Sequence, residues 1–408
     1  MSRRAVRYYS MGDLSGRSIA AVGYVRGLVN AGVSVEWLRL QWPEDGNFRN
    51  LRAFGIDCPL VAGAAGSRSG NFADLHALAV RTSQPLGCDA VICHTQPDYW
   101  PAVFARDGRS QRVGMTVWET DRPPAYWMPL MNVADRIVVP CRMNGDDFRK
   151  AGVRPDVHVV PHVRMHRPHT YAPTELDDMR RQLGIAAGHR VFYCIGAWDP
   201  RKAVPDLLEA YARAFRADDG VTLLVKTGKS GYGEPPFHEP RATRAMFDAL
   251  TKELERACGR PLAPMRLIDG DLDDRSLNAL HALGDCYVSL SHGEGWGLGA
   301  FDAATLGKPV IMTGWSAQLD YLAGASGTWP GAVPYRLVNA PVFPPHLPSF
   351  FPGQHWAQAD LDAAAALMRR FHEDGDEMRA AARAIRTDIL NRFAEPVVIR
   401  QLLEAIDG

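Results

Sequence analysis

The segment SHGEGWGLGAFDAATLGKPV, residues 291–310, carries the strongest structural pattern in the sequence. It follows an apolar run at 286–290, its glycines precede a predicted helix at 299–305, and a second apolar run occupies 309–313. Strand, glycine-rich turn, helix and strand form the βαβ unit of parallel sheets, which bind ligands at the carboxyl ends of their strands. The free N–H groups and the positive dipole end at the helix start suit a phosphate or a sugar hydroxyl.

Alternating strands and helices precede this segment through most of the chain. The nearer part is predicted to contain strands at 191–195, 221–225 and 265–268 and helices at 204–215, 241–258 and 276–283. An earlier series of apolar runs predicts strands at 6–9, 33–40, 90–93, 113–117 and 136–139. The polar, Pro- and His-rich stretch 161–188 separates the two series and is typical of an interdomain connection.

These patterns predict an α/β protein with two Rossmann-like, doubly wound domains that face one another across a cleft. We expect an N-terminal domain at 1–165, a C-terminal domain at 166–390, and a helix at 391–408 that packs back on the first domain. The length of 408 residues supports two domains, because a single core rarely grows beyond roughly 250 to 300 residues.

The overall composition argues against several classes of protein. The 46 Lys and Arg residues balance 46 Asp and Glu residues, so no net field attracts nucleic acid. The first residues lack a signal-peptide pattern and no run of about 18 apolar residues occurs, which predicts a cytoplasmic protein and leaves open peripheral contact at the inner membrane face. The seven cysteines form no CxxC pair, so neither a disulfide framework nor a zinc site is expected.

Two acidic residues flank the predicted phosphate cradle. Glu294 precedes the helix and Asp302 lies within it, eight residues later. Carboxylates at these places could accept hydrogen bonds from the hydroxyls of a sugar and a ribose. The alternative is that the glycines only form a tight turn and that both acids are solvated.

The motif EGWGL at 294–298 is followed by an acid at 302 and by GKPV at 307–310. This pattern resembles the E-x7-E signature of the large retaining GT-B glycosyltransferase family (family 4 type). Glu294 matches the first acid, and Asp302 stands at the second with a side chain one methylene shorter. The resemblance implies a GT-B fold and transfer of a hexose-type sugar from a UDP- or GDP-sugar to an acceptor hydroxyl, with retention and without a metal or other cofactor. It also assigns the donor site to Gly295, Trp296, Gly297 and Leu298.

Basic residues that could hold a donor diphosphate follow two predicted strands. In the family, the loop that corresponds to DPRK at 199–202 carries such a residue, and Lys202 fits it. Ala197 replaces the family's commoner Arg, and we expect Arg201 or Lys226 to supply that charge. Fixed cations beside a departing nucleoside diphosphate stabilise the transition state more than the ground state, so no metal partner is required.

The acidic run 269–274 is an alternative place for a metal, because it resembles the DxD metal site of the other major glycosyltransferase fold. It comes directly before a predicted helix and no further ligands are apparent around it. The simpler interpretation is that Asp273 is the N-cap of that helix. We therefore predict no metal site.

The stretch VWETD at 117–121 looks like the WE[ST]D variant within the same family. Many relatives carry a histidine here near the reacting sugar, and Trp118 and Glu119 take its place. A carboxylate could orient the acceptor hydroxyl or accept its proton, so Glu119 joins Glu294 and Lys202 as a catalytic candidate. Trp118 is alternatively a packing residue.

Further candidates on the acceptor side come from the first series of strands. His94 ends the run at 90–93 and is a rival catalytic histidine, with a purely structural role as the alternative. Gly12 and Gly16 match the family's N-terminal loop, and Asp13 is predicted to touch the acceptor. The histidine of VVPHV at 159–163, which resembles the family's junction between domains, is interpreted as structural.

The resemblance favours a carbohydrate or lipid-linked acceptor in polysaccharide or glycolipid synthesis, and no nucleic acid partner is expected. Two other interpretations stay open. One is a catalytically inactive GT-B protein that binds sugar nucleotides or acts as a scaffold, which Ala197, Asp302 and the missing histidine would favour. The other is a GT-B epimerase. The sequence makes no prediction of the sugar, the linkage or the oligomeric state.

Overall fold

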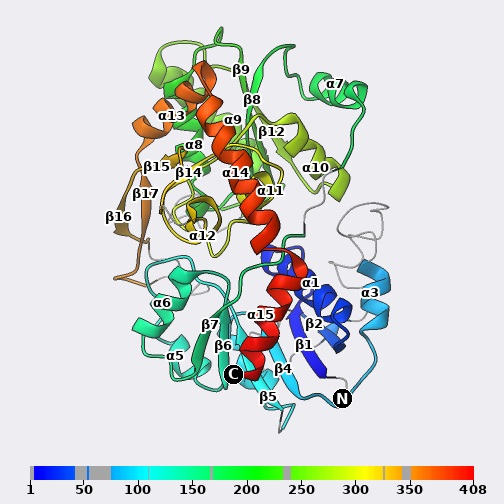
Figure 1. Cartoon of the computed structure of the whole chain (residues 1–408). Helices are drawn as coiled ribbons and strands as arrows, with labels where there is room; N and C mark the ends of the chain where they lie inside the picture. Colours follow the sequence, from blue (N-terminus) through cyan, green and yellow to red (C-terminus); the bar gives the residue numbers. More distant parts are fainter. Residues whose placement is uncertain are drawn as a thin grey trace. The chain divides into compact units, whose positions relative to one another are not determined.

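A computed structural model describes residues 4–41, 53–54, 75–108, 110–165, 169–232, 240–324, 327–341 and 351–408 of the chain (Figure 1). The chain forms two compact units. The first comprises Met1–Trp118, Arg122–Arg167 and Ile389–Gly408, and the second comprises Glu119–Asp121 and Pro168–Asp388. The tripeptide Glu119–Asp121, which the predicted boundaries put in the first domain, therefore belongs to the second unit.

The first unit is built on a seven-stranded sheet with the order β3-β2-β1-β4-β5-β6-β7. Its strands are β1 (Ala5–Met11), β2 (Ser34–Leu40), β3 (Ala53–Phe54), β4 (Ala90–His94), β5 (Gln111–Met115), β6 (Arg136–Val139) and β7 (Asp156–Val159). All neighbours are parallel except β2 and β3. The order reverses between β1 and β4, which is the switch point where doubly wound sheets bind ligands.

The helices of the first unit cover this sheet. They are α1 (Gly16–Asn30), α3 (Leu75–Arg81), α4 (Trp100–Phe104), α5 (Trp127–Met131), α6 (Arg142–Lys150) and α15 (Glu395–Asp407). The C-terminal helix α15 packs on α1, where a Cβ at Gly27 would come within 2.4 Å of the Ile399 side chain. Glycine at this position therefore permits the close approach of the two helices.

The second unit is built on a six-stranded parallel sheet with the order β12-β9-β8-β13-β14-β15. Its strands are β8 (Arg190–Ile195), β9 (Val221–Thr227), β12 (Met265–Asp269), β13 (Cys286–Ser289), β14 (Val310–Thr313) and β15 (Ala332–Val333). Two small antiparallel hairpins accompany it, β10 (Ser230–Gly231) with β11 (Arg241–Ala242) and β16 (Tyr335–Asn339) with β17 (His355–Ala359). The order of the main sheet reverses between β8 and β13.

Helices pack on both faces of the second sheet. They are α7 (Pro173–Gln182), α8 (Val204–Ala214), α9 (Thr243–Cys258), α10 (Asp274–Leu283), α11 (Leu298–Thr305), α12 (Leu319–Leu322), α13 (Leu361–Glu373) and α14 (Asp376–Arg392). Phe192 of β8 lies at the centre of the core, with its ring 5.3 Å from that of Phe215 and 5.8 Å from that of Phe371. All three side chains are at most 1% exposed, so burial of their aromatic surface stabilises this layer.

The α/β class and the two doubly wound sheets are confirmed. The predicted strand at 113–117 is displaced by two residues, because β5 runs from Gln111 to Met115. Beyond its end, the side chain of Asn144 binds the backbone N–H and C=O of Trp118. The N-cap prediction is confirmed, since the Asp273 carboxylate accepts the Ser276 N–H at 2.7 Å.

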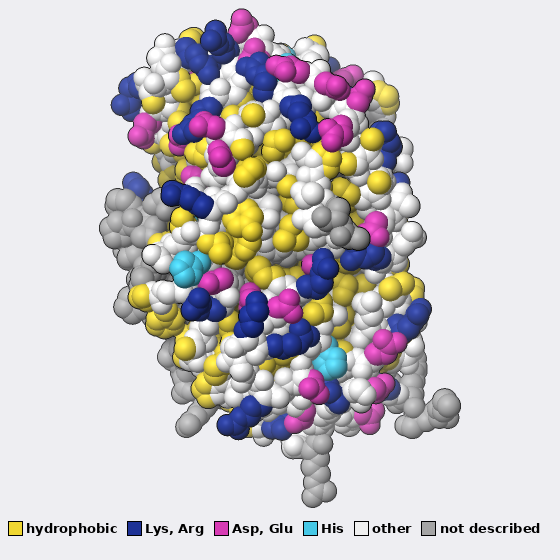
Figure 2. Space-filling model, turned by 60° about the vertical axis from the view of Figure 1, so that its left-hand side comes forward, with side chains coloured by type: hydrophobic (Ala, Val, Ile, Leu, Met, Phe, Trp, Pro, Cys, Tyr) yellow, Lys and Arg dark blue, Asp and Glu magenta, His cyan; other side chains and the backbone are white. Residues whose placement is uncertain are grey.

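Composition also leads to predictions about the cysteines and about membrane-spanning segments. The six described cysteines are free, and Cys58 lies outside the described residues. No described helix is both long and apolar enough to cross a membrane. On the face shown in Figure 2, basic and acidic side chains are interspersed.

Candidate functional site

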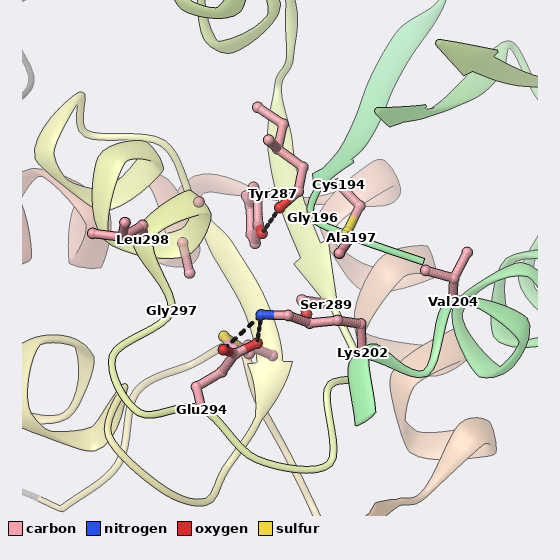
Figure 3. A pocket seen from close by; sticks show the side chains of 14 residues that line it. Cys194, Gly196, Ala197, Lys202, Val204, Tyr287, Ser289, Glu294, Gly297 and Leu298 are labelled. Carbon is pink, nitrogen blue, oxygen red and sulfur yellow. Dashed lines mark hydrogen bonds and ion pairs between the residues drawn. The ribbon is translucent and has the colours of Figure 1, made fainter. Parts of the chain in front are cut away.

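A cavity lies at the switch point of the second sheet, beyond the carboxyl ends of β8 and β13 (Figure 3). Its empty volume is about 340 Å³, including space open to solvent. The walls come from the end of β8 and the loop after it, from β13, and from the start of α11. The lining residues are Cys194, Ile195, Gly196, Ala197, Lys202, Val204, Tyr287, Ser289, Glu294, Gly297, Leu298, Gly299, Ala300 and Met312.

The first turn of α11 forms one wall of the cavity. Its N-cap is Gly297, which adopts φ 84° and carries no side chain that could accept from the N–H groups of that turn. A Cβ on Gly299 would lie 2.7 Å from the carbonyl oxygen of Ile195 and 2.7 Å from the hydroxyl of Tyr287. Glycine is therefore required for the helix start to reach the end of β8, where its N–H groups and dipole favour an anion.

Lys202 projects into the cavity opposite this helix start. It ends the short 3-10 helix η3 (Pro200–Lys202), which Asp199 caps by accepting the Lys202 N–H at 3.2 Å. The Lys202 Nζ lies 2.7 Å from both carboxylate oxygens of Glu294, as Figure 3 shows. The two residues come from the loops after β8 and β13, so the switch point brings together side chains that are 92 positions apart.

Arg201 also contacts the Glu294 carboxylate. Its guanidinium donates to the Gly293 carbonyl at 2.6 Å and to Glu294 Oε2 at 3.2 Å. A second guanidinium nitrogen lies 3.7 Å from Glu119 Oε1. Burial lowers the pKa of Arg201, but the charges of Glu119 and Glu294 outweigh burial and hold it above its ordinary value.

Glu294 is 5% exposed and stays ionised despite its burial. Burial raises the pKa of this carboxyl, but the charges of Lys202 and Arg201 outweigh burial and lower the pKa to about 2. A carboxylate with this pKa accepts hydrogen bonds at neutral pH and has no proton to donate. It can therefore bind hydroxyl groups but cannot act as a general acid.

Five predicted donor residues lie outside the cavity lining, namely Arg201 and the four residues Lys226, Gly295, Trp296 and Asp302. Asp302 is half-buried within α11, and its burial together with the charge of Asp274 raises its pKa to about 7. Lys226 is half-buried near the end of β9, where burial lowers its pKa and the charge of Asp271 partly opposes the shift. Gly295 and Trp296 are buried, and the Trp296 ring packs 5.2 Å from those of Phe301 and Tyr321.

The predicted acceptor residues other than Glu119 belong to the first unit. Gly12 donates its N–H to the Leu40 carbonyl at 2.9 Å, and Asp13 Oδ1 accepts the N–H of Ser15, the N-cap of α1. Gly16 is the first residue of α1. These residues follow β1 and therefore lie at the carboxyl edge of the first sheet.

His94 and Trp118 are both buried in the first unit. His94, at the end of β4, is 1% exposed, and its Nδ1 lies 2.8 Å from the Tyr8 hydroxyl. Burial, His162 and Arg17 lower the pKa of His94 well below its usual range, so the imidazole is neutral. Trp118 is 4% exposed and its ring lies 4.9 Å from that of Trp127, which is a packing contact.

Two groups of residues around the site are missing from the sequence prediction. After β14, Ser316 accepts the backbone N–H of Glu294 at 2.9 Å. His292 stacks on Trp356 with ring centroids 4.5 Å apart and lies 2.8 Å from the Ala357 carbonyl through its Nδ1. Both contacts join segments distant in sequence, and no local pattern indicates them.

No protein-family model matches the sequence. The D-inositol 3-phosphate glycosyltransferase of Rhodococcus erythropolis (strain PR4 / NBRC 100887) is 30% identical over 143 residues, which is 35% of this chain. The match spans 29% of that relative, less than a third of its length.

Similarity to solved structures extends over nearly the whole chain. Anabaena HepE in complex with UDP and glucose has a TM-score of 0.62 at 16% identity, covering 99% of this chain and 100% of HepE. Sucrose-phosphate synthase from Thermosynechococcus elongatus has a TM-score of 0.63 at 15% identity, covering 98% of both chains. These neighbours are GT-B glycosyltransferases, and the predicted GT-B fold is confirmed.

Proposed function

We propose that the chain is a glycosyltransferase that moves a hexose-type sugar from a UDP- or GDP-sugar to an acceptor hydroxyl, with retention and without a metal ion. The observation that carries this proposal is the arrangement of the second-unit cavity, in which the start of α11, the ammonium of Lys202 and the carboxylate of Glu294 converge. The GT-B fold supports it, as do the complexes of HepE with UDP and with UDP-glucose.

The donor diphosphate would lie between Lys202 and the first turn of α11. Negative charge grows on the leaving diphosphate as its bond to the anomeric carbon breaks, so cations fixed beside it lower the barrier. Lys202 and Arg201 supply this charge without a metal. Among the described residues, no group of three or more His, Cys, Asp or Glu side chains could hold a metal ion.

Glu294 would accept hydrogen bonds from hydroxyls of the transferred sugar. Its ionised state excludes the general-acid role that one carboxyl plays in glycosidases. In the proposed reaction, the bond from the anomeric carbon to the diphosphate oxygen breaks and a bond to the acceptor oxygen forms on the same face. The acceptor proton ends on the departing phosphate oxygen, either directly or by way of the Glu119 carboxylate. Retention rests on the resemblance of 294–310 to the retaining family.

The other candidate residues would bind the rest of the donor and the acceptor. Asp302 would contact the ribose and Lys226 the diphosphate, with Gly295 and Trp296 shaping the loop. Gly12, Asp13, Gly16 and His94 would serve a carbohydrate or lipid-linked acceptor of polysaccharide or glycolipid synthesis, and Glu119 would orient or deprotonate its hydroxyl. We propose a cytoplasmic location, with the inner membrane face as the place of contact with such an acceptor.

Nucleotide binding tests this proposal directly. Thermal unfolding of the purified chain would be followed with UDP, GDP and their sugar conjugates, each with and without EDTA. We expect one nucleotide to raise the Tm whether or not EDTA is present, and Lys202→Ala to lose that response. Lys252→Ala is the matched control, because Lys252 is exposed on α9. A wild-type chain that no nucleotide stabilises would overturn the proposal.

Transfer itself needs a second measurement. Release of UDP or GDP from the stabilising sugar nucleotide would be followed with and without carbohydrate acceptors. A chain that binds the sugar nucleotide but never cleaves it to UDP or GDP would be the inactive scaffold rather than an enzyme. The anomeric configuration of an isolated product, read by NMR, decides between retention and inversion.

A further inference from the structure

Ser316 has a backbone conformation that is unusual for its residue type. Among the residues that the structure describes, two non-glycine residues have positive φ, Ala203 at 48° and Ser316 at 78°. Both adjoin the ion pair of the cavity, since Ala203 follows Lys202 and Ser316 contacts Glu294. A side chain in the left-handed region costs free energy, and such strain persists only where surrounding contacts offset it.

The contacts that hold Ser316 form a relay of hydrogen bonds with one direction. Gln318 donates its Nε2 to the Thr313 carbonyl at 2.8 Å, so its Oε1 faces Ser316. The Ser316 hydroxyl donates to this Oε1 at 2.9 Å. The Ser316 Oγ is then left to accept the N–H of Glu294, which it does at 2.9 Å. A carbonyl only accepts, so the Thr313 oxygen determines the direction of the whole relay.

The side-chain hydrogen bonds of the relay reach the site through Glu294. Ser316 is 2% exposed and Gln318 is fully buried, and neither lines the cavity. Their bonds hold the backbone of Glu294 from the end of β14, while Lys202 and Arg201 hold its carboxylate. Glycine would adopt this φ without strain but would lack the hydroxyl. The strained serine is therefore explained by the hydrogen bond that it makes.

We propose that Ser316 and Gln318 are positioning residues that hold Glu294 at the reacting sugar. The proposal rests on the proposed function, because it assumes that Glu294 contacts the transferred sugar. Without the relay, the Glu294 backbone is released on one side and its carboxylate no longer has a single position. Lys202 and the start of α11 are not part of the relay, so binding of the diphosphate is unaffected.

Ser316→Gly tests this proposal because it removes the hydroxyl and also removes the strain of a side chain at positive φ. We expect Ser316→Gly to keep a Tm at or near that of the wild type and to keep its Kd for UDP or GDP. We expect kcat for release of nucleotide from the sugar nucleotide to fall roughly threefold to tenfold, the effect of one lost neutral hydrogen bond. Ser316→Ala should lose the same activity and also some stability, since it retains the strain.

Two further variants keep the test falsifiable. Ser316→Asn should regain part of the kcat, because asparagine tolerates the left-handed region and offers an oxygen acceptor. Thr251→Ala is the control, because it deletes a side-chain hydrogen bond to the Phe247 carbonyl on α9, away from the cavity. Unchanged kcat in Ser316→Gly would overturn the positioning role, as would an equal loss of nucleotide binding and turnover. Failure of the proposed function would appear differently, as a wild-type chain without nucleotide binding.

Discussion

The ammonium of Lys202 lies 2.7 Å from each carboxylate oxygen of Glu294, so both oxygens take part in this ion pair. The pair bridges the loops after β8 and β13, and Arg201 adds a second cation at 3.2 Å from the same carboxylate. A diphosphate entering the cavity would share Lys202 with Glu294. The pair is thus both a stabilising contact and the centre of the proposed donor site, and substitutions can separate these two roles.

Lys202→Met removes the cation and keeps the length of the side chain. The free energy of unfolding should fall by about 2 kcal/mol, because the buried carboxylate of Glu294 loses its nearer cation. Nucleotide binding should be lost. Adding Glu294→Gln to the same chain should restore part of the stability, since the carboxylate that lost its lysine is gone and Arg201 keeps Glu119 as a counter-ion, while binding stays lost. Urea unfolding and calorimetric titration with UDP or GDP would measure the two quantities, and a double variant that regains binding would contradict the donor role of Lys202.

Glu119→Gln asks whether Glu119 is a catalytic group or only a counter-ion of Arg201. The two charged groups are 3.7 Å apart and both side chains are partly exposed, so the stability change should stay below about 1 kcal/mol. We expect sugar transfer to fall by about 100-fold or more, the usual effect of losing a general base, with nucleotide binding retained. Initial rates of transfer at saturating donor would show this. A decrease of less than threefold would mean that Glu119 only balances the charge of Arg201.

Asp302→Asn should change how stability depends on pH. The folded pKa of Asp302 is raised from 3.8 to about 7, so between these values the native state binds a proton that the unfolded state has lost. Stability therefore falls as pH rises from about 4 to about 7, and Asp302→Asn should remove this fall and be more stable above pH 7 by about 1 to 3 kcal/mol. Denaturant unfolding of both proteins at pH 5 and pH 8 measures the difference. Parallel pH curves would show that Asp302 has an ordinary pKa.

Glu294 should give the opposite sign in the same experiment. Its folded pKa is lowered from 4.5 to about 2, so its contribution to stability is present above pH 4.5 and is lost as pH falls toward 2. Glu294→Gln should therefore be less stable than the wild type at pH 7, and the gap should close in acid. A gap that stays constant from pH 7 to pH 2.5 would contradict the lowered pKa.

Local sequence patterns predict the parts of the fold in which each element is apolar and bounded by turn residues. The predicted run 191–195 and β8 differ by one residue, as do the predicted helix at 299–305 and α11. The same patterns do not predict β7, whose sequence DVHV is only four residues long, or β16, which is largely exposed. These strands form through pairing with a neighbour rather than through their own burial.

Local sequence patterns likewise predict only some residues of the candidate site. Glu294, Gly297 and Lys202 stand in short motifs with a direct chemical interpretation, and the structure brings all three to one cavity. Ser316 has no such motif, because a left-handed serine depends on hydrogen bonds to residues that only the folded chain brings near. Trp296 is the opposite case. It lies within the motif, but its ring packs in the core.

Gly299→Ala tests whether the start of α11 must approach β8 as closely as it does. The added methyl would meet the Ile195 carbonyl oxygen and the Tyr287 hydroxyl at 2.7 Å, closer than Cβ atoms are normally found. The helix start must therefore move away from the cavity, which we expect to lower stability by about 1 to 3 kcal/mol and to weaken nucleotide binding at least tenfold. Gly87→Ala is the matched control, because its Cβ would meet nothing within 4 Å. If Gly299→Ala bound UDP or GDP as well as Gly87→Ala does, the N–H groups of α11 would not be part of the phosphate site.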